Sequence, residues 1–146
     1  MKPKPTWLYR QSGVIPYRFE SGQLEVLLIT SQSAGKWIIP KGVIERFMSA
    51  ADSAAKEAYE EAGVRGVVSK ESVGSYDYNK WGGTCHVEVF LLAVNKILDE
   101  YPESQVRQRQ WFALDEAVAK VTPEEVGPMI SALPQRIDPK SGPVTR

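Results

Sequence analysis

The stretch that decides the fold occupies residues 42–64 and reads GVIERFMSAADSAAKEAYEEAGV. Its second part, residues 49–62, predicts a helix, because Ser49 and Asp52 form a capping box and Gly63 stands where a helix commonly ends. At about 3.6 residues per turn, five alanines share one face of this helix and are small enough to pack closely against a sheet. They are Ala51, Ala54, Ala55, Ala58 and Ala62.

Three glutamates, Glu57, Glu60 and Glu61, lie on the other side of the predicted helix, where we expect them to face solvent. Carboxylates three and four residues apart repel one another, and a bound divalent cation would reverse that repulsion. Oxygen ligands from one helix face, with room for water and phosphate oxygens, suit Mg²⁺ or Mn²⁺. The alternative is an acidic helix face that interacts only with water.

The wider spacing of these residues resembles the Nudix box, the signature of the Nudix hydrolase family. It is carried by Gly42, the three glutamates, Gly63 and Val64. Residues 37–42 look like the strand and loop that precede the box, and residues 111–112 like the segment that closes the family's sheet. The resemblance implies an α/β fold, an α/β/α sandwich with a central mixed β-sheet. We expect one domain over residues 1–146, with a flexible tail from residue 134.

Two positions depart from the box. The usual loop glutamate is Met48 here, and the usual arginine is Lys56. In the family these two side chains commonly brace the loop against the helix. We expect Asp52, four residues before Lys56, to pair with it instead. Ala58 replaces a larger aliphatic residue, which is a smaller change in packing. All three glutamates are present, so we predict that the brace is exchanged and the chemistry retained.

The resemblance implies hydrolysis of a pyrophosphate bond by water, with Mg²⁺ or Mn²⁺ as the cofactor. It makes Glu57 and Glu61 metal ligands together with the backbone carbonyl of Lys41. Glu60 would be a further ligand or the general base, so all three glutamates are candidate catalytic residues. Some relatives add a carboxylate from outside the helix, for which the candidates are Glu88 and, with less weight, Asp77 and Glu103.

The pattern is closest to the branch that cleaves diphosphoinositol polyphosphates and diadenosine polyphosphates. Such substrates need several cations or hydroxyls, and the candidates are Arg10, Ser31, Lys36, Lys41, Arg107 and Arg109. Arg107 and Arg109 alternate on a strand-like segment, so we expect both to face the metal helix from the opposite side. The alternatives are an RNA 5′-end pyrophosphohydrolase, a nucleotide-sugar pyrophosphohydrolase and a non-catalytic module that binds a nucleotide.

Composition limits the remaining possibilities. The chain has 146 residues with 18 basic and 18 acidic side chains, and zero net charge argues against a nucleic-acid coat or a polybasic membrane binder. One cysteine, Cys85, and one histidine, His86, are too few for an internal disulfide or a Cys/His zinc site. Without an apolar signal or membrane span, we expect the cytosol. The expected partner is a small-molecule polyphosphate, and the oligomeric state stays open.

Outside the box, the chain alternates between strand-like and turn-like segments. We expect a hairpin from residues 7–19 and 24–30, a short strand at 37–39, a loop at 41–48, one or two strands within 64–78, a turn at 79–84 and a strand at 86–94. A last strand begins at Trp111, and helices follow at residues 114–121 and 123–133. From Pro134 onward, polar residues and prolines predict a frayed tail.

Overall fold

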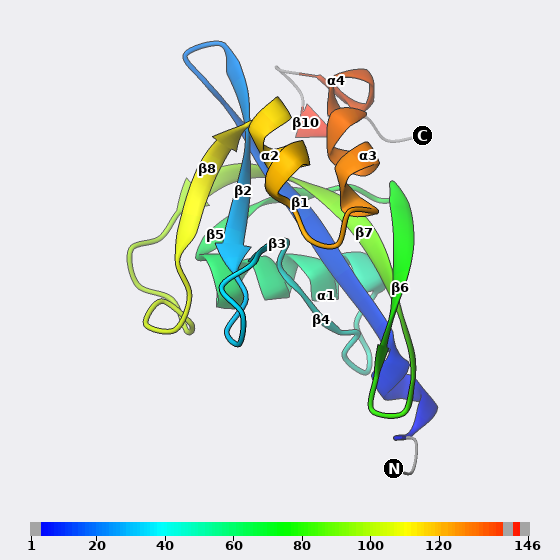
Figure 1. Ribbon diagram of the computed structural model, residues 1–146. Coiled ribbons are helices and arrows are strands. Elements are labelled where there is room, and N and C mark those ends of the chain that lie inside the picture. The colour runs from blue at the N-terminus through cyan, green and yellow to red at the C-terminus, as the bar shows by residue number, and fades with distance from the viewer. Residues whose placement is uncertain (1–3, 139–141, 144–146) are drawn as a thin grey trace.

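The sheet is built around one long hairpin. The computed structural model describes residues 4–138 and 142–143. After a short 3-10 turn, η1 (Thr6–Tyr9), strands β1 (Arg10–Glu20) and β2 (Gln23–Thr30) pair antiparallel (Figure 1). Ser21 and Gly22 between them both have positive φ, as a tight type I′ hairpin requires. The hairpin predicted from the sequence is therefore present.

The other strands extend this hairpin into one mixed sheet. In the described part of the chain they are β3 (Trp37–Ile38), β4 (Lys41–Val43), β5 (Val64–Val68), β6 (Gly74–Lys80), β7 (Gly83–Ile97) and β8 (Arg109–Ala113). The order is β3-β2-β1-β7-β5, while β4 pairs with β1, β6 with β7 and β8 with β2. Strands β1 and β7 run parallel, and the other pairs are antiparallel.

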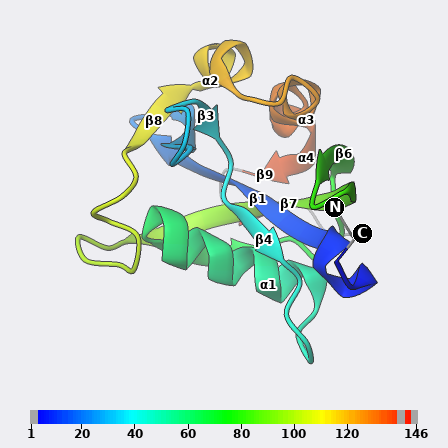
Figure 2. The same cartoon turned by 60° about the horizontal axis from the view of Figure 1, so that its bottom comes forward.

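Helices cover both faces of the sheet. One face carries α1 (Ala50–Glu57), which continues directly into the π-helical turn η2 (Ala58–Ala62). The opposite face carries α2 (Leu114–Lys120), α3 (Val126–Ser131) and α4 (Leu133–Arg136), as Figure 2 shows. The fold is thus an α/β sandwich with a mixed sheet between two helical layers, as the resemblance implied.

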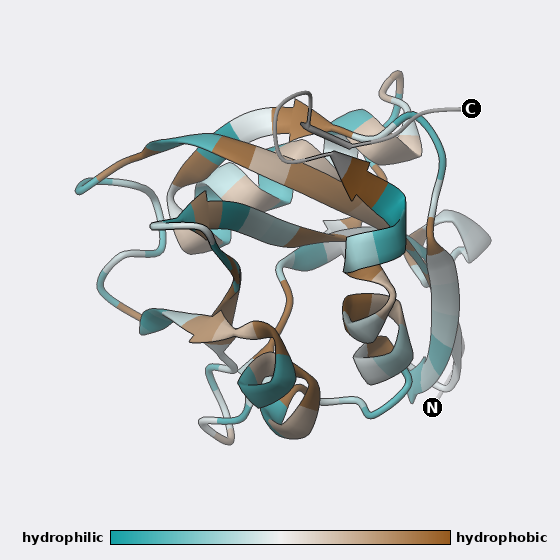
Figure 3. Cartoon of the chain, turned by 90° about the horizontal axis from the view of Figure 1, so that it is seen from above, coloured by the Kyte–Doolittle hydropathy of each residue, from teal (hydrophilic) through white to brown (hydrophobic). Residues whose placement is uncertain are grey.

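Two apolar clusters hold these layers together, one on each face of the sheet. Beneath α1, Ala54, Ala58 and Ala62 have no exposed surface, so the predicted alanine face does allow the helix to approach the sheet closely. The cluster beneath α2, α3 and α4 includes the fully buried Ile130 and Leu133. The hydrophobic segments gather in the central strands between the two helical layers (Figure 3).

Three segments differ from the sequence-based expectation. The turn expected at residues 79–84 is shorter, because residues 79–80 of β6 pair with residues 83–84 of β7. Residues 41–43, expected in a loop, form β4, because their backbone pairs with residues 11–13 of β1. The expected frayed tail instead completes α4 and forms the paired strands β9 (Ile137–Asp138) and β10 (Gly142–Pro143); the rest of that tail lies outside the described residues. Among the described residues, no helix is long and apolar enough to cross a membrane.

Candidate active site

Strand β4 brings a glycine against a carboxylate of the acidic helix. Gly42 pairs with Ser12 of β1, and the side chain of Glu57, the last residue of α1, lies against the Gly42 backbone. A Cβ atom at residue 42 would lie 2.4 Å from the Glu57 carboxyl carbon, which is closer than two such atoms can approach. Only glycine at this position therefore leaves room for the Glu57 carboxylate.

The end of the acidic helix is a wide turn that buries one of its glutamates. Residues 58–62 form the π-helical turn η2, and Gly63 ends it with φ 68°, a left-handed conformation that glycine adopts without strain. Such turns are frequent at functional sites. Glu61 within it is only 8% exposed. The expectation that Glu61 faces solvent is wrong, because the β4 backbone and Arg107 enclose it.

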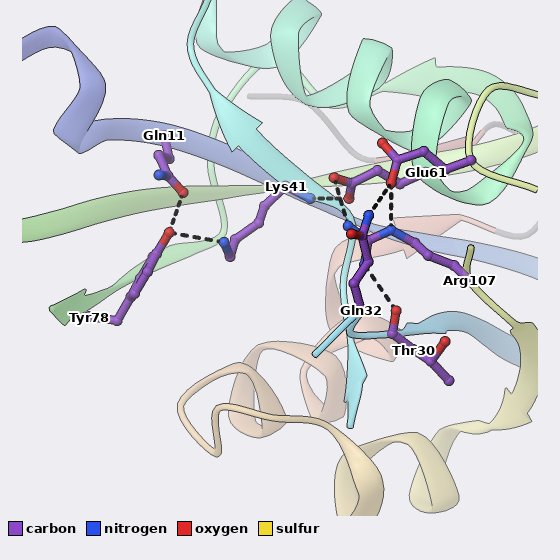
Figure 4. Close-up of polar contacts among 8 residues, drawn as sticks. Gln11, Thr30, Gln32, Lys41, Glu61, Tyr78 and Arg107 are labelled. Carbon is purple, nitrogen blue, oxygen red and sulfur yellow. Dashed lines mark hydrogen bonds and ion pairs between the residues drawn. The ribbon is translucent and has the colours of Figure 1, made fainter. Parts of the chain in front are cut away.

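Two groups hold the Glu61 carboxylate. The backbone N–H of Lys41 donates to Oε1 over 3.1 Å, and Nη2 of Arg107 lies 3.5 Å from Oε2 (Figure 4). Burial raises the pKa of Glu61 to about 7, although Arg107 and the Lys41 N–H oppose that shift. The carboxylate is thus fixed in place, but its negative charge is only partly compensated.

The negative charge of Glu57 is compensated even less than that of Glu61. It forms no ion pair with any residue that the structure describes. Burial, with the charges of Glu61 and Glu60, raises the pKa of Glu57 to about 8. We call Glu57 and Glu61 the carboxylate pair. Their neighbouring hard oxygen donors suit a divalent cation, which would relieve the repulsion between them.

The third glutamate, Glu60, is paired with a lysine of the same helix. Nζ of Lys56 lies 3.1 Å from Oε2 of Glu60 and 2.6 Å from Oε2 of Glu45, and both contacts raise the pKa of Lys56. Among the residues that the structure describes, no three His, Cys, Asp or Glu side chains are grouped to hold a metal ion as they stand. The expected pair between Asp52 and Lys56 is wrong, because Glu45 reaches Lys56 from the preceding loop.

The loop before α1 is fastened to the helix by a serine as well. The hydroxyl of Ser53, which is fully buried, accepts a hydrogen bond from the backbone N–H of Glu45 over 2.9 Å and lies 4.0 Å from Sδ of Met48. The Met48 side chain therefore packs against Ser53 of the helix and cannot form the bracing ion pair that the family's usual glutamate forms from this position. Glu45 replaces that brace from three residues earlier in the loop.

The outside carboxylate that acts on the carboxylate pair is Glu103. Its charge raises the pKa of both members, and its backbone N–H donates to the carbonyl of Glu60 over 3.0 Å. Glu88, the first candidate from the sequence, lies on β7 in register with Ser12 of β1. Asp77 is paired with His86 at 2.7 Å on exposed strands. Among the three candidates, Glu103 is the one with hydrogen bonds to the acidic helix and to Arg107.

Arg107 lies beside the carboxylate pair, and the expectation that it faces the helix from the opposite side is wrong. Besides Glu61, its guanidinium donates to Glu103 over 2.8 Å and to the carbonyl of Thr30 over 2.9 Å. The side chain is 11% exposed. Arg107 therefore links the acidic helix, the loop before β8 and the end of β2.

Arg109 lies at the end of the helix. Its guanidinium donates to the carbonyls of Ala62 and Gly63 over 2.9 and 3.3 Å and stacks on Tyr101. A cation at this position satisfies carbonyls that a helix leaves without partners. The donors of Arg109 that were expected to bind phosphate are thus engaged by the protein itself.

The remaining candidates are spread over the surface. Arg10 is exposed at the start of β1, and Lys36 is exposed in the loop after β2. The Ser31 hydroxyl accepts from the backbone N–H of Lys36, so it closes a turn. Ser31 also lines a polar cavity of about 540 Å³ between two loops, together with Thr30, Gln32, Ser104 and Arg107. Of the cationic candidates, Lys41 and Arg107 are the ones brought to the carboxylate pair.

One contact near Lys41 was missed by the sequence analysis. The Lys41 ammonium donates to the Tyr78 hydroxyl over 3.0 Å, and that hydroxyl donates to Oε1 of Gln11 over 2.9 Å (Figure 4). Burial lowers the pKa of Lys41, and the charge of Glu61 opposes the shift. No periodicity relates these three strands in the sequence, so only the pairing of the sheet reveals the contact.

Known proteins share this sequence pattern. Nudix hydrolase 21, chloroplastic, from Arabidopsis thaliana is 40% identical over 117 residues, which cover 75% of this chain and 59% of that protein. The chain therefore spans about three fifths of that relative's length. Diphosphoinositol polyphosphate phosphohydrolase 3-alpha from Mus musculus is 28% identical over 125 residues, which cover 80% of this chain and 75% of that protein. Because relatives carry chloroplastic and mitochondrial names, the cytosolic location stays an expectation.

The fold is shared as well. A crystal structure of a C. elegans Ap4A hydrolase binary complex matches with a TM-score of 0.72 and 21% identity, over 86% of this chain and 95% of that one. The NUDIX domain model matches residues 9–133, a range that contains the glycine, the acidic helix and every strand of the central sheet. On the sequence, the fold and the placement of Gly42 against Glu57, this chain belongs to the NUDIX family.

Proposed function

We propose that this chain is a metal-dependent pyrophosphohydrolase that cleaves a pyrophosphate bond in a nucleoside or inositol polyphosphate. The observation that carries the proposal is the carboxylate pair. Glu57 and Glu61 are held together against the β4 backbone, and both have raised pKa values. Two partly buried groups of like charge do not stabilise a protein. Their presence is explained if they act as metal ligands in a hydrolase.

The proposed cofactor is Mg²⁺ or Mn²⁺, with the carboxylate pair as ligands and the Lys41 carbonyl as a further donor. When bound, the metal polarises the phosphate and lowers the pKa of the attacking water. The chain's own groups orient the ligands, because the Lys41 N–H and Arg107 hold the two oxygens of Glu61. Glu60, oriented by Lys56, is the further ligand or the proton acceptor, and Glu103 is the nearby outside carboxylate.

The proposed substrate is a polyphosphate such as a diadenosine or diphosphoinositol polyphosphate. Lys41 offers an ammonium group whose charge acts on Glu61, and Arg107, although bonded to Glu61 and Glu103, adds a second positive charge there. Two cations in this region suit a chain of several phosphates. The cavity beside Arg107 is lined by hydroxyl and amide side chains, and such groups suit the uncharged part of the substrate. The names of the mouse relative and the C. elegans structure support this substrate class.

The test is a Mg²⁺-dependent phosphate-release panel on the purified chain. It should span diadenosine polyphosphates, diphosphoinositol polyphosphates, nucleotide sugars, nucleoside triphosphates and triphosphorylated RNA. We expect turnover of the first two classes, and its loss when a chelator is added. Preferential turnover of RNA or nucleotide sugars would replace the substrate assignment, and full activity with excess chelator would overturn the metal dependence.

A second candidate function is a non-catalytic module that binds a nucleotide or polyphosphate. Two contacts favour it: Arg107 lies 3.5 Å from Oε2 of Glu61, and Lys56 lies 3.1 Å from Oε2 of Glu60. Calorimetry with the same panel separates the two functions. Binding without turnover of any member, with metal present, would establish the module.

Restoring the usual box residues is expected to change turnover little. Met48→Glu with Lys56→Arg should alter kcat by less than about tenfold, or about 1.4 kcal/mol, because Glu45 already fastens the loop to residue 56. Steady-state kinetics of the double variant measure the effect. A gain of roughly several hundredfold would instead show that the natural brace does not work.

The stability of the metal-free protein should fall as the pH rises. The pKa values of Glu57 and Glu61, about 8 and about 7, exceed the ordinary value of 4.5. Between the ordinary pKa of 4.5 and a pH of about 8, the folded state therefore binds more protons than the unfolded state. The free energy of unfolding decreases as the pH rises through this range.

Metal binding releases these protons, so the stabilisation by Mn²⁺ should grow over the same pH range. Thermal melts at about pH 5 and pH 8.5, with chelator or Mn²⁺, measure both trends. Equal slopes in wild type and Glu57→Gln would contradict the assignment.

A further inference from the structure

We propose that Tyr78 and Gln11 are positioning residues that hold the ammonium group of Lys41 on the β6 side of the carboxylate pair, where it binds a phosphate group of the substrate. This inference rests on the proposed function and adds to it a device that orients one cation. The three residues, with Cys85, form a chain of hydrogen bonds that we call the lysine relay. It runs across four strands: β4, β6, β1 and β7.

The contacts of the relay have a defined direction. Nζ of Lys41 donates to the Tyr78 hydroxyl over 3.0 Å, and that hydroxyl donates to Oε1 of Gln11 over 2.9 Å. The Gln11 amide nitrogen in turn lies 3.7 Å from the sulfur of Cys85. Gln11 is 3% exposed and Cys85 is fully buried. Because the amide donates to the sulfur, its oxygen is left facing Tyr78.

The relay keeps the lysine from neutralising its acidic neighbours. The backbone N–H of Lys41 is bonded to Glu61, and both members of the carboxylate pair act on its charge. Even so, Nζ forms no ion pair within 4.0 Å of any carboxylate that the structure describes. The ammonium lies over the Tyr78 ring instead, 4.5 Å from its centroid, an attractive arrangement for a cation.

The bound lysine still has donors to offer. An ammonium group has three N–H bonds, and within the described residues the relay accounts for one of them. The other two are available for an anionic oxygen that enters beside the carboxylate pair. A phosphate group adjacent to the reacting one has the charge to use them. Without the relay, a flexible lysine would pair with Glu57 or Glu61, and the metal would have to displace it.

The first experiment is a double-variant cycle on the purified chain with the best substrate of the panel. Lys41→Met should raise KM about tenfold to a hundredfold through the loss of a charge-assisted hydrogen bond. Tyr78→Phe removes only the hydroxyl and should raise KM about three- to tenfold with kcat nearly unchanged. Because the hydroxyl acts through the lysine, the double variant should be no worse than Lys41→Met within about twofold. Additive effects would overturn the inference.

The second experiment measures Mn²⁺ binding by calorimetry without substrate. In Tyr78→Phe the released lysine can pair with the carboxylate pair, so Mn²⁺ affinity should fall by about threefold. Adding Lys41→Met to that variant should restore the affinity. If the Tyr78 hydroxyl only stabilised the fold, adding Lys41→Met would not restore the Mn²⁺ affinity. This arm needs no turnover, so it tests the relay even if the panel finds no substrate.

Gln11→Leu is a second test of the relay, and Tyr17→Phe is the matched control. Gln11→Leu removes the acceptor of the Tyr78 hydroxyl and should act in the same direction as Tyr78→Phe. Tyr17→Phe removes a buried hydroxyl that has no hydrogen-bond partner among the described residues, six positions along β1 or about 20 Å from Gln11. It should change neither KM nor Mn²⁺ affinity. An equal effect of Tyr17→Phe and Tyr78→Phe would show that the losses are structural.

Discussion

Glu61→Gln is expected to reduce kcat by roughly a thousandfold, or about 4 kcal/mol, because one member of the proposed metal site loses its charge. The variant should fold, since a glutamine side-chain oxygen can still accept the N–H of Lys41 that Oε1 accepts now. The part of the destabilisation at high pH that comes from Glu61 should also disappear, while the part from Glu57 remains. Initial rates with saturating substrate and Mg²⁺ measure the loss, and circular dichroism checks the fold.

Glu71→Gln is the matched control for that variant. Glu71 is exposed on the surface, and its backbone carbonyl, which the substitution leaves in place, accepts from the Ser69 hydroxyl. This variant should retain full activity and the full thermal stabilisation by Mn²⁺.

Wild-type turnover in Glu61→Gln would end the metal-hydrolase proposal. Loss of activity with unchanged Mn²⁺ binding would show that Glu61 is needed for turnover but is not a metal ligand.

Gly42→Ala is expected to reduce kcat by about a hundredfold, because an ångström-scale displacement of a reacting group has effects of this order. The new methyl group would lie 2.4 Å from the Glu57 carboxyl carbon. The contact is with the far end of a flexible side chain, so Glu57 can rotate away without moving β4. We therefore expect a well-folded protein with lowered Mn²⁺ affinity and lowered turnover, measured by calorimetry and initial rates.

Gly127→Ala is the matched control, because it adds the same methyl group at a position that has room for it. A Cβ atom at Gly127 in α3 would have its nearest neighbour at 3.5 Å, an ordinary contact, and alanine favours a helix over glycine. This variant should be as active as wild type and at least as stable. If Gly42→Ala binds Mn²⁺ and turns over substrate as well as Gly127→Ala does, Glu57 does not act from its present position.

The local features of the acidic helix could be predicted because neighbouring residues decide them. The Ser49 hydroxyl accepts the backbone N–H of Asp52, and Gly63 adopts the left-handed conformation that ends the helix. Both depend on residues within one turn. The alanine face follows from the helical repeat alone, and the hairpin from two β-rich segments joined by a short polar turn.

The partners of the glutamates could not be predicted in the same way. Lys56 has two carboxylates within reach in the structure, and it pairs with Glu45 and Glu60, although Asp52 has the favourable helical spacing. Arg107 was expected opposite the helix and instead lies against Glu61. Glu60 has a helical spacing to Lys56, but Glu45 and Arg107 come from loops without a periodic pattern. Competition among several charges then decides which pairs form.

The sequence by itself determined the family pattern, the position of the acidic helix and which residue types carry the proposed chemistry, because each depends on spacing along a single element. Only the tertiary structure decided that Glu61 is buried, that Glu103 is the nearby outside carboxylate and that Tyr78 and Gln11 hold Lys41. These contacts join residues far apart in the chain. Their geometry depends on strand pairing and loop conformation together, and no local preference of the residues specifies either.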